Sequence, residues 1–355
     1  MREHGADATA YGTAGRVGAG AVGADEEAGT GGTDGAAGAG AAGNLREPRE
    51  PGEFEELRPM LFSIAYRILG SVGEAEDAVQ ETWLRWAGSA TRPRSAKAFL
   101  SAVVTRISID VLRSARVRRE RYTGPWFPEP LLADPYEDPE RSAELADSLS
   151  MAALLLLERL TPLERAVFVL REVFGFGFPQ VAAAVGRSEA ACRQLAVRAR
   201  RHMDEGRPRF EADRRERAEL AGRFFDAFKE GDVDGLRELL AADVHLLGDG
   251  GGKAPQLPGG VRGAERVARM LATMTTALTG IGAAVEPHEV NGRPGAVLRD
   301  RDGKVIATWS LEFLDGRIRT IRSVLNPDKL GHLGPVADAW AITREASRAR
   351  PPRTV

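Results

Sequence analysis

The chain has 355 residues, a length that predicts two or three domains. Hydrophobic residues make up 43%, enough for folded cores, and a formal net charge of −2 excludes a uniformly basic protein, so any nucleic-acid surface must be local. The single cysteine, Cys192, excludes an intrachain disulfide and fits a reducing compartment. No apolar run approaches the ~20 residues that span a membrane, and the N-terminus lacks the apolar stretch of a signal peptide. We expect a cytoplasmic, soluble protein without a membrane partner.

Composition divides the chain into segments. Residues 1–43 contain 13 Gly and 13 Ala with almost no large apolar residue, so they cannot offset their ordering entropy, and we expect disorder over residues 1–50. Helical patterns follow at 51–122 and 143–210, on either side of a Pro- and acid-rich linker at 123–142. Helices and then short strands are expected in a third domain at 214–333, before a tail at 334–355. The expected strands are Val285–Val290, Gly295–Arg299, Val305–Phe313 and Arg317–Val324.

The first helical block has an acidic face and a basic end. Glu74–Trp86 begins a helix with acids in its first turn, and Asp77, Gln80 and Glu81 form its polar face. Trp83 and Trp86 lie on its packed side. Between residues 85 and 121, ten Lys or Arg stand against two acids, a local charge of +8. In a chain of net −2, this excess favours a phosphate-facing surface over a merely solvated arginine face.

The segment Phe178–His202 has the pattern of a helix-turn-helix. Gly186 stands where a tight turn needs a positive φ, and Ser188 is placed to cap the second helix. That helix carries four arginines and no carboxylate from residue 193 to 202, as expected of a recognition helix on DNA. The alternative is two amphipathic helices of any helical domain. Cys192 falls in the core pattern and is interpreted as an apolar filler.

These motifs resemble an RNA polymerase sigma factor of the extracytoplasmic-function (ECF) family. AEDAVQETWLRW (75–86) is similar to the segment of region 2 that docks on the clamp helices of the β′ subunit, and RISIDVLRSARVRR (106–119) to the helix that reads the downstream (−10) promoter element. Residues 160–201 are similar to region 4, which reads the upstream (−35) element. The resemblance implies two all-α domains, region 2 and a helix-turn-helix region 4.

The resemblance also implies partners and contact residues. The partners are promoter DNA and core RNA polymerase, through its β′ clamp helices and β flap. Polymerase contacts are assigned to Asp77, Gln80 and Glu81. DNA contacts are assigned to Arg106, Asp110, Arg113, Arg116, Arg118 and Arg119 in region 2, and to Ser188, Glu189, Arg193, Gln194, Arg198, Arg200 and Arg201 in region 4. One departure is Arg187, which stands where many helix-turn-helix motifs place an aliphatic residue.

The third domain resembles a SnoaL-like, nuclear-transport-factor-type α+β cone, in which strands curl around a helical apolar stripe to form a cup. Three motifs, WFPEPL (126–131), DGGGK (249–253) and NPDKL (326–330), resemble those of the sigma subfamily that carries such a domain as a fused regulator. DGGGK lacks the spacing and Ser/Thr of a phosphate loop. Interdomain or regulatory roles are assigned to Trp126, Pro128, Glu129, Pro130, Asp249, Gly250, Gly251, Gly252, Lys253, Asn326, Pro327 and Asp328.

Two other functions stay open from the sequence. The cone could act as a DNA-targeted enzyme or a sensor of an unknown small-molecule ligand, with Asp243, His245, Asp249 and Trp309 lining its cup. No acid/base pair with convincing spacing supports catalysis, so we expect no enzyme, no cofactor and no metal. The chain could also be a helix-turn-helix regulator that acts without polymerase, which would not need Asp77 and Glu81. The expected function is an alternative sigma factor modulated by its third domain.

Overall fold

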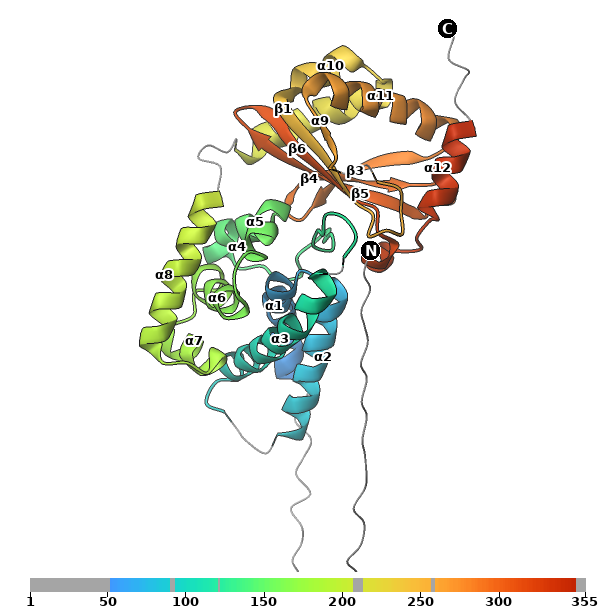
Figure 1. Cartoon of the computed structure of the whole chain (residues 1–355). Coiled ribbons are helices and arrows are strands. Elements are labelled where there is room, and N and C mark those ends of the chain that lie inside the picture. The colour runs from blue at the N-terminus through green and yellow to red at the C-terminus, as the bar shows by residue number, and fades with distance from the viewer. Residues whose placement is uncertain (1–51, 90–92, 121, 207–212, 257–258, 349–355) are drawn as a thin grey trace, which may run out of the picture. The chain divides into compact units, whose positions relative to one another are not determined.

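The structure, a computed structural model, describes residues 52–89, 93–120, 122–206, 213–256 and 259–348. The prediction of disorder over residues 1–50 therefore lies outside the described residues. Within the described ranges no helix is long and apolar enough to cross a membrane. Figure 1 shows a helical part followed by a sheet with helices of its own, so the expected fold class, two helical domains and an α+β domain, is confirmed.

Three helices form the first helical part: α1 (Gly52–Leu69), α2 (Val72–Gly88) and α3 (Ala96–Glu120). Gly70, at φ 69°, ends α1, and the Ser71 side chain accepts a hydrogen bond from the backbone N–H of Glu74 at the start of α2. Apolar residues of all three helices, among them Leu61, Val79 and Leu100, are buried together in one core. This packing holds the polar face of α2 outward.

The second helical part follows the linker. Its elements are η1 (Pro139–Arg141), α4 (Ser142–Leu149), α5 (Met151–Leu157), α6 (Pro162–Phe168), η2 (Val169–Val173), α7 (Phe178–Val185) and α8 (Glu189–Gly206). Between α7 and α8, Gly186 has a left-handed φ of 65°. Arg187 donates its backbone N–H to the Ala182 carbonyl while its side chain is exposed, so an arginine fits this turn without entering the core.

The third domain contains a six-stranded sheet in the order β2-β1-β6-β5-β4-β3, in which β1 and β6 are parallel and the other neighbours antiparallel. The four predicted strands are present, and β1 and β2 were not predicted. Its elements are α9 (Arg214–Glu230), α10 (Val233–Leu239), β1 (Leu240–Asp249), β2 (Val261–Arg262), α11 (Ala264–Gly280), β3 (Ala284–Val290), β4 (Arg293–Arg299), β5 (Val305–Leu314) and β6 (Arg317–Val324).

Helices α9, α10 and α11 cover one face of this sheet (Figure 1). On that side Phe224 and Phe228 pack with Trp309, Leu311 and other strand residues in one apolar core. Successive residues of a strand point to opposite faces. Val297 thus faces away from that core and joins a smaller cluster with Val305 and Val324.

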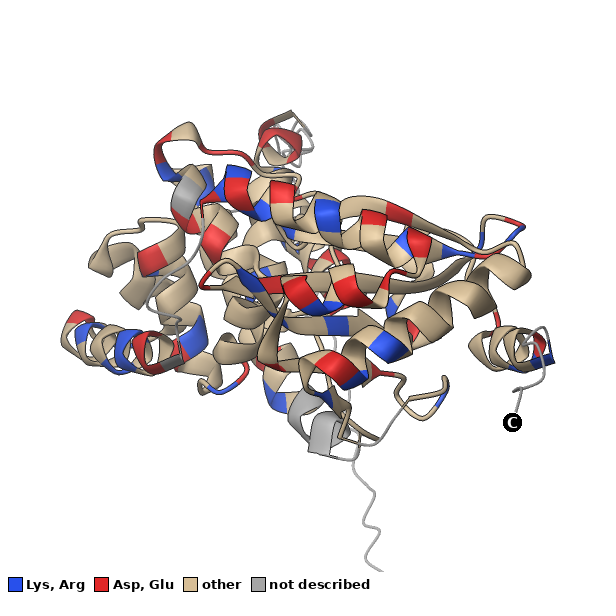
Figure 2. Cartoon of the chain, turned by 90° about the horizontal axis from the view of Figure 1, so that it is seen from above, with Lys and Arg blue, Asp and Glu red and all other residues tan. Residues whose placement is uncertain are grey.

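Residues from outside the cone join the smaller cluster: Phe127 of the linker and Met151 of α5 are buried in it, and Leu132 and Leu155 are partly buried against it. The chain ends its described part with η3 (Pro327–Lys329), η4 (Gly331–Leu333) and α12 (Ala339–Arg348). Ile342 and Ala346 of α12 pack against the main core of the cone. Lys and Arg are interspersed with Asp and Glu along the helices of the molecule, as Figure 2 shows.

Candidate functional site

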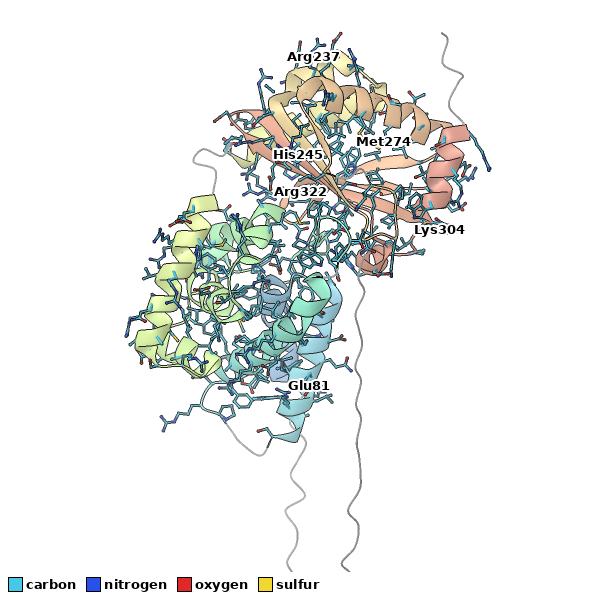
Figure 3. The ribbon with its side chains drawn as sticks, viewed as in Figure 1. Glu81, Arg237, His245, Met274, Lys304 and Arg322 are labelled. Carbon is cyan, nitrogen blue, oxygen red and sulfur yellow. The ribbon has the colours of Figure 1, made fainter. Side chains whose placement is uncertain are left out.

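The outer face of α2 is polar and exposed. Asp77 and Gln80 are exposed, and Glu81, half-buried, pairs with Arg85 at 2.9 Å. Figure 3 shows Glu81 on this helix. One turn further, Leu84 is 57% exposed, so the face places an apolar side chain among carboxylates and an amide. This combination is suited to a protein partner, because interfaces combine an apolar centre with a polar rim.

The two tryptophans of α2 differ in environment. Trp86 is 3% exposed and packs against Phe99, with ring centroids 5.7 Å apart. Trp83 is half-buried, and its ring centroid lies 5.0 Å from that of Phe54. Trp86 is therefore part of the core, whereas Trp83 keeps an edge toward solvent.

Helix α3 carries the basic residues predicted to read the downstream element. Arg106, Asp110 and Arg113 are exposed, and Arg113 pairs with Asp110 at 3.1 Å. Arg106 donates hydrogen bonds to the backbone carbonyls of Ala184, at 3.1 Å, and Ala183 at the end of α7. The side chains of Arg116, Arg118 and Arg119 lie outside the described residues. In this arrangement one predicted DNA contact of region 2 is bound to region 4.

Helix α8 holds its arginines outward through ion pairs. Ser188 accepts a hydrogen bond from the Ala191 N–H, as a cap of the helix. The four pairs are Arg193–Glu189 at 2.9 Å, Arg198–Glu164 at 2.9 Å, Arg200–Glu172 at 2.7 Å and Arg201–Glu205 at 3.0 Å. All four arginine side chains are more than half exposed. The pairs with exposed carboxylates, Arg193–Glu189 and Arg201–Glu205, are weak and can exchange for phosphate, whereas the Glu164 carboxylate is buried.

The surroundings of Glu164 and Cys192 shift the pKa values of both side chains. Burial raises the pKa of the Glu164 carboxyl, but hydrogen bonds from Arg198 and Thr161 outweigh it, so the pKa lies below its usual value. Burial raises the pKa of the Cys192 thiol, which is 0% exposed. The thiol is therefore kept neutral inside the helix-turn-helix core, as an apolar filler requires.

In the linker, Glu129 binds the start of α2. Its carboxylate accepts hydrogen bonds from the Ser71 hydroxyl at 2.8 Å and from the Val72 N–H at 2.7 Å, and its own N–H donates to the Gly70 carbonyl at 2.9 Å. A carboxylate at a helix N-terminus is stabilised by the helix dipole. The Tyr66 hydroxyl donates to the Glu129 carbonyl at 2.6 Å. WFPEPL thus lies directly on the helix that carries the outer polar face.

The other side of the linker contacts the cone through Asp249, the last residue of β1, which is 0% exposed. Its carboxylate accepts the Phe127 N–H at 2.8 Å and the hydroxyl of Tyr122, and pairs with Lys329 at 2.7 Å. The Lys329 ammonium lies 4.3 Å from the centroid of the Trp126 ring. Burial, together with the neighbouring Asp249, raises the pKa of Tyr122 above its ordinary value.

The glycines of DGGGK permit this close contact. A Cβ on Gly251, whose φ is 56°, would lie 2.4 Å from Asn326 Nδ2 and 2.6 Å from the Tyr122 hydroxyl. Asn326 in turn donates to that hydroxyl at 2.8 Å. At the rim, Lys253 pairs with Asp328 at 2.5 Å, with both side chains exposed. The three motifs therefore meet at one interdomain contact, which we call the linker clamp: Tyr122, Trp126, Phe127, Asp249, Gly251, Asn326 and Lys329.

The remaining predicted interdomain residues border the linker clamp. A Cβ on Gly250 would lie only 2.5 Å from the carbonyl oxygen of Ala254. Gly252, at φ 73°, lies beside Thr123. Pro130 is buried, and its carbonyl accepts a hydrogen bond from His332 at 2.6 Å. Pro128 is buried next to Gly70, and Pro327 begins the turn η3.

The four residues considered as lining a catalytic or ligand-binding cup each have different partners. Trp309 is 2% exposed and packs edge-on against Phe228, with centroids 5.1 Å apart. Asp243 is exposed and pairs with Arg319 at 3.3 Å, and His245 bonds the Gly259 carbonyl at 3.0 Å. Asp249 belongs to the linker clamp. Figure 3 labels His245 on β1, where it lies opposite Thr320 of the neighbouring strand β6. These four side chains do not converge on one acid/base site.

Known proteins share this sequence and structure. Residues 54–118 match the model of Sigma-70 region 2, residues 150–203 that of Sigma-70 region 4 and residues 221–323 that of the SnoaL-like domain. The chain is 39% identical to the ECF RNA polymerase sigma factor SigJ of Mycobacterium tuberculosis over 287 residues, 78% of this chain and 92% of SigJ. It belongs to the ECF RNA polymerase sigma factors.

A solved structure of SigJ and one further relative agree with this assignment. The crystal structure of M. tuberculosis SigJ has a TM-score of 0.62 and 35% identity, covering 79% of this chain and 98% of that chain. The probable ECF sigma factor SigI of the same species is 35% identical over 190 residues, 53% of this chain and 65% of SigI. The predicted family, with its fused SnoaL-like domain, is confirmed.

Sequence reasoning missed part of the contact between the domains of this sigma factor. Asn291, in the turn between β3 and β4, is 0% exposed with φ 53°. Its amide donates to the Tyr66 hydroxyl at 2.7 Å, and its N–H donates to the Leu131 carbonyl at 2.7 Å. Lys329 was inside the quoted NPDKL motif without a role of its own. The dipeptide Asn291-Gly292 was a recognisable hairpin signal, but nothing in it indicated a partner.

Proposed function

We propose that this ECF sigma factor is an alternative sigma subunit that recruits core RNA polymerase to selected promoters and helps open them. In this proposal α2 binds the β′ clamp helices through Asp77, Gln80 and Glu81, and region 4 binds the β flap. Helix α3 reads the −10 element and α8 the −35 element. The support is family membership together with two exposed basic helices and one exposed acidic helix face.

We further propose that the SnoaL-like domain modulates promoter recognition through the linker. The observation that carries this is Asp249, a buried carboxylate of the cone whose partners include the linker N–H of Phe127 and the hydroxyl of Tyr122, which follows α3. On the same linker, Glu129 binds the start of α2. A shift of the cone therefore acts on the segment that joins the −10 reader to region 4.

Because the SnoaL-like domain is part of the same chain, this control needs no separate regulatory protein. A tethered domain is present at a high effective concentration, so it can hold the linker without a separate anti-sigma protein. The contact of Arg106 with the carbonyls of α7 gives the direction of control. In the described arrangement the −10 reader is bound to the helix-turn-helix, and we expect a weaker linker clamp to release both readers for promoter DNA.

Transcription by shortened chains tests this proposal. A chain ending at residue 325 lacks Asn326 and Lys329 of the linker clamp but keeps the sheet, and we expect it to give more transcript with core polymerase than the full chain. A chain ending at residue 210 also uncovers Phe127 and Met151, so we expect weaker core binding than from the 325-residue chain. Indistinguishable promoter activity and core binding for all three chains would contradict modulation.

A further inference from the structure

Val197 is an exposed aliphatic residue in the middle of α8. Its side chain is 64% exposed, more than those of the two other large apolar residues exposed in the described part of the chain, Leu84 and Trp340. A β-branched residue has only modest helix propensity, and an exposed one adds no core packing. Neither local helix stability nor core packing therefore explains valine at this position.

The position of Val197 on the helix is opposite the core. At about 100° per residue, Val197 lies roughly 140° to 200° around the helix from Cys192, Leu195 and Ala199, the buried side of α8. Six other exposed residues lie within about 60° of Val197 around the helix: Ala190, Arg193, Gln194, Arg200, Arg201 and Asp204. Together with Val197 they form the outward side of α8, which we call the outer ridge.

The outer ridge sets Val197 among arginines. Arg193 and Arg200 lie on one side of Val197 and Arg201 on the other, all more than half exposed, while Ala190 and the amide of Gln194 share the same side of the helix. A DNA major groove has the complementary arrangement. Phosphates form its walls, and thymine methyl groups and base edges form its floor.

We propose that Val197 contacts the 5-methyl group of a thymine in the major groove of the upstream promoter element and so helps to determine its sequence. The inference rests on the proposed function, since it takes α8 as the upstream reader. Gln194, about one turn away, is suited to bind an adenine edge, so Val197 and Gln194 select A·T pairs while the arginines of the outer ridge bind phosphates.

Single-atom changes in the DNA test this contact. The upstream element is first defined by transcription with core polymerase and the full chain. Binding is then measured to duplexes in which each thymine of that element is replaced in turn by deoxyuridine, which removes only the methyl group. At one position we expect roughly fourfold weaker binding of the unchanged chain, the effect of one methyl-sized contact.

Variants of the full chain connect that loss to Val197. Val197→Ala should show the same weakening on thymine DNA and no further loss on deoxyuridine at that position. Val197→Thr keeps one methyl and should retain part of the sensitivity. Trp340→Ala, an exposed apolar residue of α12, is the control and should keep the full sensitivity.

The outcomes separate the inference from the function on which it rests. Undiminished deoxyuridine sensitivity of Val197→Ala at every position, or no sensitivity of the unchanged chain, overturns the thymine contact. Loss of core polymerase binding in Val197→Ala with unchanged DNA binding also overturns it. Failure of the unchanged chain to direct transcription with core polymerase instead refutes the proposed function.

Discussion

Asp249→Asn tests whether the linker clamp depends on a buried charge pair. The Asp249 carboxylate is 0% and the Lys329 side chain 7% exposed, and their pair at 2.7 Å lies beneath Trp126 and Tyr122. Removing one charge of a buried pair leaves the other without compensation, which costs about 3–5 kcal/mol in the free energy of unfolding. We expect a loss of this size, measured by urea unfolding with tryptophan fluorescence at neutral pH.

The chain supplies a matched control between the same two motifs. Lys253 and Asp328 form an exposed pair, with side chains 56% and 59% exposed. Exposed pairs contribute about 1 kcal/mol or less, so Asp328→Asn should be nearly neutral. The double variant Asp249→Asn with Lys329→Met removes both buried charges and should recover much of the loss. An Asp249→Asn variant no less stable than Asp328→Asn would refute the reasoning.

Two further predictions concern buried polar groups of the same interface. Asn291→Ala removes a buried amide that donates to Tyr66 and accepts from the Leu131 N–H, so we expect a loss of about 2–3 kcal/mol in unfolding free energy. Asp315→Ala is the control, because Asp315 is exposed and has a similar φ of 51°, so its replacement removes no buried hydrogen bond and only strains the backbone. Equal losses of unfolding free energy in the two variants would contradict this account. The pKa of Tyr122 is raised by burial and by Asp249. The contribution of the neutral Tyr122 hydroxyl to the free energy of unfolding is thus fully present below the unfolded pKa of about 10 and is lost as the pH rises above it. In unfolding curves measured over a series of pH values, Tyr122→Phe should lose less stability at alkaline pH than the unchanged chain.

Local signals explain why most of the sheet could be predicted. The turns Asn291-Gly292, Asp302-Gly303 and Asp315-Gly316 separate runs that alternate or are rich in β-branched residues, and β3 to β6 follow each other as antiparallel neighbours. Their pairing needs only short connections. The helix-turn-helix was predictable for the same reason, since Gly186 and the apolar spacing act within a few residues.

Strand β1 shows where the sequence was insufficient. Leu240, its first residue, continues the helical spacing of Leu236 and Leu239 in α10, so the local pattern does not mark the start of a strand. Its parallel partner is the distant strand β6, which no turn signal announces. The contact of Asn291 with Tyr66 is likewise between residues far apart in the chain. Contacts between residues far apart in the chain form only when the domains assemble, so the local sequence does not predict them. The motifs DGGGK and NPDKL could be recognised because each is a short continuous stretch of sequence.

Run-off transcription with purified core polymerase tests the central claim most directly. With the full chain added, we expect defined transcripts whose start sites share two upstream elements, and the variant Asp77→Ala with Glu81→Ala should bind core polymerase poorly and give little transcript. Gln194→Ala, on α8, should keep core binding while losing promoter selection. Transcripts that do not depend on the added chain, or undiminished core binding by Asp77→Ala with Glu81→Ala, would contradict the account.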